Sequence, residues 1–469
     1  MPPPAYVENM LICSPYYPNY RDQNGNIRSL NLPEKKQYDL AILINSLPES
    51  QQPDLVIVRL DSTFQHIPGN IQAISQPTIA LIGDTHHMRR PIQSMLGFLL
   101  GEHFDYLLID HTPQHAHWFS EAGIAPLYWL PGTLLADTWI KPCYKPVAQV
   151  VFIGQMGKAH PVRNSMLERM QQANIPLSVL TVPHKTACRH YNQAAITFNH
   201  SLNGDFNLRV FETLASGGFL LTEKLEPQAG QESIFRDGEH LVYYRGVDDL
   251  IEKCNYYLNH TQERNRIARA GHLQVQKLFS IKKRMAAFGQ LLANKAHQSW
   301  QPTAIDKRAI AYGCRNKDDL FQRASIYEWI QEQHRAFGSI ECNVSSQADA
   351  RIVCDMTDLP RLIISLDNNR KALELAQESG IHPGRFSRKS STTASRNFQL
   401  IAADDMQTTA ILPHTEAVII CDWISCDIKQ QQQIILACAK AKLTPVDHTK
   451  GLFVGIKDWN DVWNKPPHT

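Results

Sequence analysis

The sequence lacks an excess of charge of either sign and has no paired cysteine motif. Its 469 residues include 47 lysines and arginines against 45 aspartates and glutamates, a formal net charge of +2. This balance argues against a dedicated nucleic-acid-binding protein, which would carry a basic surplus. Ten cysteines are spread along the chain without a Cys-x-x-Cys pair, which argues against a structural zinc site. Most of them lie in apolar runs, which indicates buried free thiols and a reducing compartment.

Long apolar segments are missing as well. No stretch of about 18 apolar residues occurs, so we predict no membrane-spanning helix. The segment from Met1 to Pro18 lacks the basic and apolar regions of a signal peptide. The 23 glycines and 27 prolines are too few for a collagen-like or low-complexity chain. These absences predict a globular, cytoplasmic protein. Its length of 469 residues predicts roughly two to four domains.

What the chain does contain is a repeated alternation of short apolar runs and helical stretches. Continuous apolar runs such as 54–60 are typical of strands that are covered on both faces. The alternation predicts an α/β protein with parallel, doubly wound sheets. We expect an N-terminal domain over residues 1–145, a second over 146–298 and, after a break at Trp300-Gln-Pro302, a third over 303–469.

The most informative segment is a polar loop, 199–207, and the predicted helix 208–216 that follows it. A helix N-terminus offers unpaired N–H groups and a positive dipole, so it is a natural anion site. Arg209 adds a bidentate partner for phosphate, and the Glu212 carboxylate could accept both hydroxyls of a ribose. These features suit a sugar nucleotide, although an Arg–Glu ion pair on a surface helix would present the same pattern.

This segment resembles the C-terminal signature of CgeB-like spore-maturation glycosyltransferases, a branch of the GT-B group. That family carries an Asn-x-Arg-x-Phe-Glu motif followed by small residues and paired glycines. Here the motif is Asn207-Leu-Arg-Val-Phe-Glu212, followed by Ala215-Ser-Gly-Gly218. Further similar stretches follow in the family's order, and the resemblance covers about residues 40–295.

The resemblance implies a GT-B-like fold, in which two Rossmann-like domains face each other. It implies transfer of a sugar from a nucleotide-diphosphate sugar to a hydroxyl-type acceptor on a glycan, a protein or a small molecule. The helix dipole and arginine would replace a metal, so we predict no metal and no cofactor beyond the donor. Many retaining members have an earlier glutamate, whose position is Gly204 here, and the neighbouring Asp205 is the candidate for its role. The expected donor-binding residues are therefore Asp205, Asn207, Arg209 and Glu212.

Two further loops follow predicted strands. In the loop 154–163, Gly154 would let the backbone approach a diphosphate, and Lys158 or Arg163 could neutralise it. Glycine is also common in any strand-to-helix turn. The other loop contains Asp84 and His86, at the carboxyl end of a strand, where open α/β sheets bind ligands.

Asp84 and His86 are our candidate catalytic residues. Either could act as the base for the acceptor hydroxyl, or steer the sugar if the reaction retains configuration. A helix cap formed by Asp84 is the alternative. A metal site that includes His87 is disfavoured, because adjacent residues rarely converge on one ion. A second polar cluster is interpreted as helix capping and wet surface; it contains Asp110, His111, His115 and His117.

The sequence of the third domain predicts another α/β unit, with strands at 351–355, 362–367, 398–402 and 417–421 and a helix at 370–379. Asp367 before that helix resembles the ribose-binding turn of Rossmann methyltransferases, but the run 351–358 has no glycine-rich turn. We therefore expect a degenerate accessory domain. A bifunctional enzyme that also methylates is one alternative, and a non-catalytic scaffold that binds nucleotide sugars or glycans is another.

Overall fold

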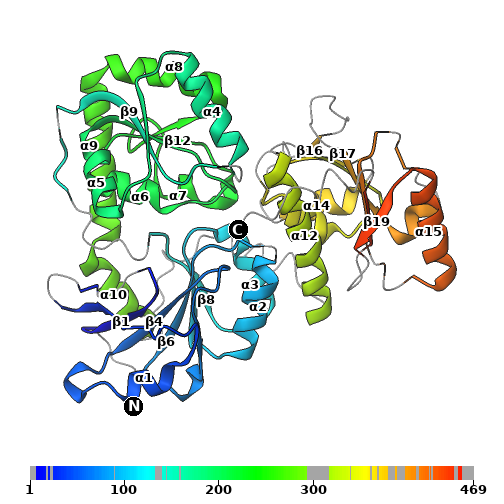
Figure 1. The fold of residues 1–469 in the computed structure, drawn as a ribbon, viewed down its shortest axis with the longest axis horizontal. Coiled ribbons are helices and arrows are strands. Elements are labelled where there is room, and N and C mark those ends of the chain that lie inside the picture. The colour runs from blue at the N-terminus through cyan, green and yellow to red at the C-terminus, as the bar shows by residue number, and fades with distance from the viewer. Residues whose placement is uncertain are drawn as a thin grey trace. The chain divides into compact units, whose positions relative to one another are not determined.

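The chain folds into two compact units (Figure 1). The larger comprises Met1–Gly157 and Val162–Ile305, and the smaller comprises Lys158–Pro161 and Asp306–Thr469. The predicted break at 300–302 lies outside the described residues. The computed structural model describes residues 7–16, 20–21, 25–88, 90–132, 140–143, 145–157, 160–292, 316–337, 340–359, 362–366, 369–378, 386–387, 397–407, 411–412, 414–421, 423, 426–447 and 453–456.

The first sheet of the larger unit has six parallel strands in the order β2-β1-β4-β6-β7-β8. The predicted parallel α/β arrangement is confirmed, and the predicted strand 78–82 has the same bounds as β6. A small parallel pair, β3 and β5, lies beside it. The elements are β1 (Met10–Cys13), β2 (Ile27–Ser29), β3 (Gln37–Asp39), α1 (Leu40–Asn45), β4 (Leu55–Leu60), β5 (Ile67–Gly69), β6 (Thr78–Ile82), α2 (Pro91–Gly101), β7 (Tyr106–Ile109), α3 (Ala116–Glu121) and β8 (Leu127–Trp129).

The second sheet of the larger unit has five parallel strands in the order β10-β9-β11-β12-β13. The chain moves outward from β9 in one direction to β10 and in the other to β11, so the gap between β9 and β11 is the switch point where such sheets bind ligands. The elements are β9 (Val147–Ile153), α4 (Pro161–Gln172), β10 (Leu177–Leu180), α5 (His184–Gln193), β11 (Ala194–Asn199), α6 (Leu208–Ala215), β12 (Leu220–Glu223), α7 (Gln231–Ile234), β13 (Val242–Tyr244), α8 (Gly246–Asn259) and α9 (Thr261–Phe279).

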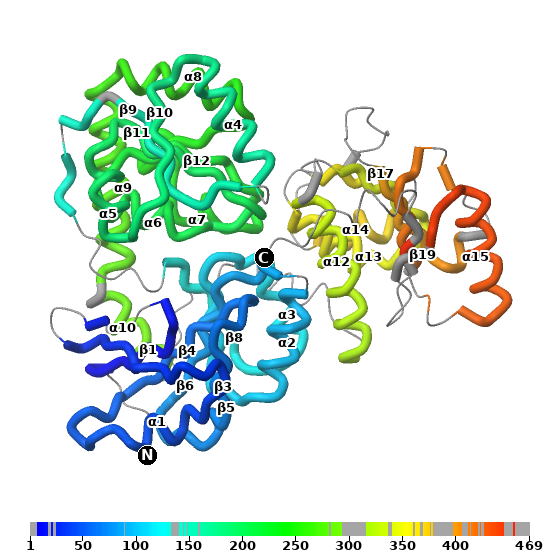
Figure 2. The backbone as a smooth tube through the Cα atoms, in the orientation of Figure 1, coloured from blue at the N-terminus to red at the C-terminus, as the bar shows by residue number. Residues whose placement is uncertain are grey.

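The next helix, α10 (Ile281–Leu292), returns the chain to the first sheet (Figure 2). Phe288, Leu291 and Leu292 are buried in the same core cluster as residues of β1, β4, β6 and β7. Arg284 donates hydrogen bonds to the carbonyl oxygens of Pro131 and Gly132, just after β8. Burial lowers the pKa of Arg284 to about 9. Both ends of the larger unit's sequence therefore contribute to its first core.

The smaller unit contains a seven-stranded sheet in the order β16-β15-β14-β17-β18-β20-β19. All strands are parallel except β20, which is antiparallel to β18 and to β19. Three of the four predicted strands correspond to β15, β17 and β18. The elements are α12 (Lys317–Phe337), β14 (Glu341–Val344), α13 (Ala350–Met356), β15 (Ile363–Leu366), α14 (Arg370–Glu378), β16 (Phe386–Ser387), β17 (Asn397–Ala402), β18 (Ala417–Cys421), α15 (Ile428–Lys440), β19 (Thr444–Asp447) and β20 (Phe453–Ile456).

The predicted strand at 351–355 is wrong, because these residues form the helix α13. Asp349 caps this helix, and its side chain accepts a hydrogen bond from the Arg351 backbone N–H. A short buried apolar run has no periodicity that separates a strand from a helix. Within it, Asp355 forms a bidentate pair with Arg323 of α12, with N···O distances of 2.8 and 2.9 Å. The strand of this region is β14, which precedes α13 and lies between β15 and β17 in the sheet.

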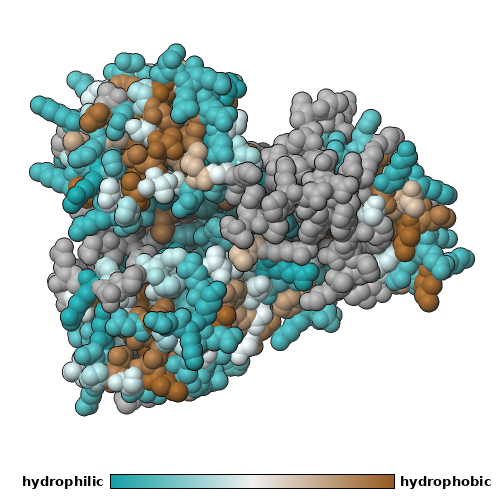
Figure 3. All heavy atoms as spheres, viewed as in Figure 1, coloured by the Kyte–Doolittle hydropathy of each residue, from teal (hydrophilic) through white to brown (hydrophobic). Residues whose placement is uncertain are grey.

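Within the part of the chain that the structure describes, no helix combines the length and apolar character needed to cross a bilayer. On the face shown in Figure 3, hydrophobic side chains form separate patches among hydrophilic ones over the larger unit. Scattered apolar surface of this kind is ordinary for folded proteins.

The buried Arg323–Asp355 pair yields a stability prediction. Both side chains are only 1% exposed, so Asp355→Asn would leave the charge of the Arg323 guanidinium uncompensated in the interior. We expect the unfolding free energy of the smaller unit to fall by about 3–5 kcal/mol, seen by calorimetry as a lower-temperature transition. Glu374→Gln, in the exposed pair with Arg370, is the control and should not shift it. Equal transition temperatures for the two variants would contradict a stabilising role for the Arg323–Asp355 pair.

Candidate functional site

The side chain of Arg209 organises the switch point of the second sheet. From the first turn of α6 it reaches back to the carboxyl ends of β9 and β11. Its Nε donates to the carbonyl oxygen of Ile153 at 2.8 Å, and its Nη1 donates to Asn199 Oδ1 at 2.6 Å. The guanidinium carbon lies 4.8 Å from the centre of the Phe152 ring, a cation–π distance. These contacts fix the N-terminus of α6 beside the end of the sheet.

Gly154 is required by this arrangement. A Cβ atom at residue 154 would lie 2.5 Å from Arg209 Nη2 and 3.1 Å from the Phe152 ring. The guanidinium cannot retreat without losing its hydrogen bonds to Ile153 and Asn199. The sequence predicted Gly154 as a place for close approach by a ligand, and the structure shows close approach by a side chain.

Arg163 brings a second positive charge to the same place. It is buried, and it donates to the carbonyl oxygens of Gln155 and His200, each at 3.1 Å. Its guanidinium carbon lies 5.2 Å from the Phe152 ring centre. Burial, and then the charge of Arg209, lower the pKa of Arg163 to about 10. Two guanidinium groups around one ring favour an anion nearby. The predicted contributor Lys158 lies outside the described residues.

The loop before α6 leaves hydrogen-bonding capacity at the helix start. Asn207 occupies the N-cap position of α6, but its side chain makes no capping hydrogen bond. Among the described residues, the buried Asn207 Oδ1 has no hydrogen-bond partner. Asp205 is buried and accepts a hydrogen bond from Ser201 Oγ at 2.7 Å. The first turn of α6 therefore retains N–H groups from which an anion could accept hydrogen bonds.

Glu212 lies one turn into α6 and has a partner that sequence reasoning missed. Its Oε1 lies 3.0 Å from Nδ1 of His184, the first residue of α5. The other ring nitrogen of His184 lies 3.7 Å from Cys188 Sγ. Hydrogen bonds with Cys188 and with Glu212 raise the pKa of His184 to about 10. Any stabilisation from this ion pair is complete below pH 6.5, the usual histidine pKa, and is lost as the pH rises through about 10.

The sequence analysis also missed a buried network at the carboxyl ends of β11, β12 and β13. His200 Nδ1 lies 3.1 Å from Glu223 Oε2 and 3.1 Å from the Tyr244 hydroxyl. The same hydroxyl donates to the carbonyl oxygen of Asn199 at 3.0 Å. Asn199, Glu223 and Tyr244 are the last residues of their strands. The rule that singled out Asp84, a polar residue where a strand ends, could have found them.

In the first sheet, Asp84 and His86 lie together after β6. Asp84 Oδ1 is 3.7 Å from His86 Nε2, and Asp84 Oδ2 is 3.3 Å from His87 Nδ1. Burial alone would raise the pKa of Asp84, but His86, His87 and His111 hold it well below its usual range. The N-cap of α2 is Arg90, so the alternative in which Asp84 caps this helix is wrong.

The sequence predicted that the second polar cluster is solvated surface, but the structure buries it. Asp110, His111, His115 and His117 are all at most 4% exposed. The Thr85 hydroxyl lies 2.8 Å from that of Thr112 and 2.5 Å from His115 Nδ1. These hydrogen bonds tie the loop after β6 to the loop after β7, so the polarity of the cluster is used inside the protein.

The loops at the two carboxyl edges of the larger unit are bonded to each other. The Phe206 backbone N–H donates to the His111 carbonyl oxygen at 2.8 Å. Gln114 Nε2 donates to the Gly204 carbonyl oxygen at 3.2 Å. The loop predicted to bind the donor therefore touches the polar cluster that influences Asp84.

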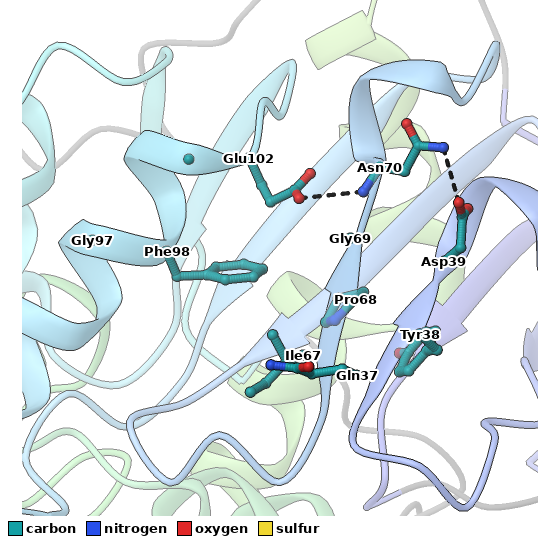
Figure 4. A pocket seen from close by; sticks show the side chains of 11 residues that line it. Gln37, Tyr38, Asp39, Ile67, Pro68, Gly69, Asn70, Gly97, Phe98 and Glu102 are labelled. Carbon is teal, nitrogen blue, oxygen red and sulfur yellow. Dashed lines mark hydrogen bonds between the residues drawn. The ribbon is translucent and has the colours of Figure 1, made fainter.

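A cavity of about 590 Å³ lies elsewhere, between the C-terminal half of α2 and the small pair β3 and β5 (Figure 4). Its carboxylates are already used by the protein. Glu102 accepts hydrogen bonds from the backbone N–H groups of Asn70 and Ile71, at 3.2 and 3.0 Å. Asp39 accepts from Asn70 Nδ2 at 3.0 Å. Asp84 precedes the other end of α2, so this cavity is not part of the polar site.

In the smaller unit, the corresponding switch point between β14 and β17 is bridged by internal hydrogen bonds. The Ala402 N–H donates to Ser345 Oγ at 2.9 Å, and the Gln347 N–H donates to Asp405 Oδ2 at 2.8 Å. Asn369 Nδ2 donates to the Ser345 carbonyl oxygen at 3.1 Å. The turn after β14, residues 345–349, contains no glycine, and Asp367 lies outside the described residues. These contacts give no support to a methyl-donor site.

Known proteins resemble a part of the chain that includes α6. Residues 171–290 match a family model described as glycosyl transferase-like. The spore protein CgeB of Bacillus subtilis (strain 168) is 28% identical over 126 residues, which cover 24% of this chain and 37% of that protein. The chain is a distant homologue of CgeB, as the sequence resemblance indicated, and the match spans little more than a third of that protein.

Solved structures give weaker similarities to this chain. Sucrose-phosphate synthase from Thermosynechococcus elongatus is 10% identical, covers 61% of this chain and 99% of its own, and has a TM-score of 0.41. HepE from Anabaena, in complex with UDP-glucose, is 8% identical, covers 62% of this chain and 99% of its own, and has a TM-score of 0.39.

The contact between Gly154 and Arg209 yields a prediction for the stability of the larger unit. Gly154→Ala should displace the guanidinium and break its charged hydrogen bonds, which lowers the unfolding free energy by about 1.5–3 kcal/mol. Gly97→Ala in α2 is the control, since a Cβ there meets no atom within 4 Å, and it should be neutral or stabilising. Denaturant unfolding measures both. A neutral Gly154→Ala would show that the guanidinium is not held in place.

Proposed function

We propose that the protein is a glycosyltransferase of GT-B type that moves a sugar from a nucleotide-diphosphate donor to a hydroxyl group of an acceptor. The observation that carries the proposal is the switch point of the second sheet. There Arg163 and Arg209 flank Phe152, next to the open N-terminus of α6, and Glu212 follows one turn later. The glycosyl transferase-like match over residues 171–290 includes α6, and together with the CgeB similarity it supports the same reaction class.

The donor would bind along α6. Its diphosphate would accept hydrogen bonds from the first-turn N–H groups near Asn207, with Arg163 and Arg209 supplying positive charge. Each guanidinium already donates two hydrogen bonds within the protein, so part of its contribution would be electrostatic. Glu212 would accept the ribose hydroxyls, while His184 holds the carboxylate at 3.0 Å. As the bond from the anomeric carbon to the diphosphate breaks, these groups stabilise the leaving group.

The acceptor would bind beside Asp84 and His86. In the transfer, the acceptor oxygen forms a bond to the anomeric carbon and its proton passes to a base. The histidines around Asp84 keep its pKa well below its usual range, which makes it a weak base. We assign the proton to His86 and let Asp84 stabilise the imidazolium that forms. The hydrogen bonds from Phe206 to His111 and from Gln114 to Gly204 support a shared site, and neither half of the reaction requires a metal.

A panel of nucleotide sugars tests this function. Thermal shift should identify at least one donor, because a bound ligand raises the melting temperature. Release of nucleoside diphosphate, with or without acceptor, then separates an enzyme from a scaffold that only binds. A protein that binds a donor but releases no nucleoside diphosphate, either with or without an acceptor, would be the scaffold.

The role of Glu212 yields a prediction for donor binding. Glu212→Gln keeps the size of the side chain but removes the charge that accepts the ribose hydroxyls. We expect donor affinity to fall by about 1.5–3 kcal/mol, measured by calorimetry with the donor from the panel. Glu232→Gln, an exposed glutamate paired with Lys224, should bind the donor normally. Normal affinity in a folded Glu212→Gln protein would remove this residue from the donor site.

The role of Asp84 yields a prediction for the chemical step. Asp84→Asn removes the charge that stabilises the His86 imidazolium, so it should lower single-turnover transfer by about 10²–10⁴-fold, the usual effect of disabling general-base catalysis, while the donor dissociation constant stays nearly fixed. His86→Gln should lose a similar factor. His103→Ala, which changes an exposed histidine, should transfer normally. If Asp84→Asn weakens donor binding instead, the residue belongs to the donor side.

A further inference from the structure

The loop after β6 also has the geometry of a cation site. We propose that Asp84, His86 and His87 bind a divalent transition-metal ion of the zinc type. Their three ligand atoms all lie within 4.8 Å of one another. The sequence analysis disfavoured this because adjacent residues rarely converge on one ion, but the fold brings them together.

Two adjacent histidines converge here because they present different ring nitrogens. His86 turns its distal Nε2 toward Asp84 at 3.7 Å, and His87 turns its proximal Nδ1 toward the other carboxylate oxygen at 3.3 Å. The two rings are 4.6 Å apart at their centres and tilted by 35°. The long reach of one ring and the short reach of the other compensate for the backbone separation of one residue.

The distances suit a first-row metal ion. Zinc binds imidazole nitrogen and carboxylate oxygen at about 2.0–2.2 Å, so ligand atoms around a tetrahedral ion lie roughly 3.4 Å apart. The separations of 3.7 and 3.3 Å, one to each oxygen of Asp84, are close to this value, and the ligand atoms of the two histidines lie within 4.8 Å of each other. Two imidazoles and one carboxylate are a set that zinc, cobalt and iron accept with open positions for other ligands.

The site is accessible from solvent on one side. The side chain of His86 is 4% exposed, whereas those of Asp84 and His87 are 30% and 44% exposed. An ion could therefore enter past His87 and be held against the buried ring of His86. The carboxylate of Asp84 offsets part of the ion's charge.

Occupancy has a consequence that rests on the proposed function. A bound ion would take the Nε2 lone pair of His86, which the transfer needs for the acceptor proton. The ion would then inhibit transfer rather than assist it, and a chelator would restore the rate. Binding itself depends only on the geometry of the three side chains.

Cobalt titration of the chelator-treated full-length protein tests the site, followed by displacement with zinc. We expect one equivalent of Co²⁺ with visible bands of nitrogen and oxygen ligation, without the near-ultraviolet band of a thiolate. The affinity for cobalt should fall at least tenfold in Asp84→Asn and in His87→Gln. Because His87 is exposed, its variant tests the proposal even if His86→Gln does not fold. His103→Gln should bind as the wild type does.

Three results would overturn the site: no stoichiometric binding, thiolate bands, or unchanged affinity in Asp84→Asn and His87→Gln. A transfer assay separates this proposal from the proposed function. If cobalt binds at the three residues and transfer continues unchanged, the metal site stands and His86 is not the base. If no transfer is found with any donor, the binding data still decide the metal site.

Discussion

The functional geometry of the larger unit depends on where one guanidinium group lies. Arg209 joins the start of α6 to the ends of β9 and β11 through hydrogen bonds to Ile153 and Asn199. It requires glycine at residue 154, and its charge acts on Arg163 across the face of Phe152. Since α6 also carries Asn207 at its N-cap and Glu212 one turn later, the same anchor fixes the position of these two expected donor contacts.

A second constraint joins the two halves of this unit. The backbone of loop 200–207 is hydrogen bonded to the loop after β7. Aromatic packing reinforces the junction, since Trp129 of β8 lies 6.4 Å from Phe206, centre to centre. A Cβ on Gly230 would come within 2.6 Å of the same indole. Movement of loop 200–207 is therefore coupled to the polar cluster around His111.

Much of this fold could be predicted from the sequence, because its strands are short continuous apolar runs separated by helices. The strand 78–82 and the helix that begins at Leu208 are confirmed in place. The helix α13 was mistaken for a strand because its apolar residues are buried all round, so no periodicity shows. Its Arg323–Asp355 pair joins residues that are 32 positions apart, a contact no local pattern reveals.

The candidate site was predictable to the extent that loops at strand ends are polar. The pattern identified Asp84, His86, Arg209 and Glu212, but not their partners. His184 meets Glu212 only because α5 packs beside α6. The histidines at 111, 115 and 117 are buried, although polar residues in a loop normally indicate surface. Pairing between elements decides both cases, and it appears only in three dimensions.

The most direct test of the account is a crystal structure of the protein with a nucleoside diphosphate. The account predicts that the diphosphate lies at the first turn of α6, near Asn207, with Arg163 and Arg209 as the nearest positive charges. It also predicts that the ribose hydroxyls contact Glu212. A nucleotide bound away from this switch point, or bound there with Glu212 still turned from the ribose, would contradict it.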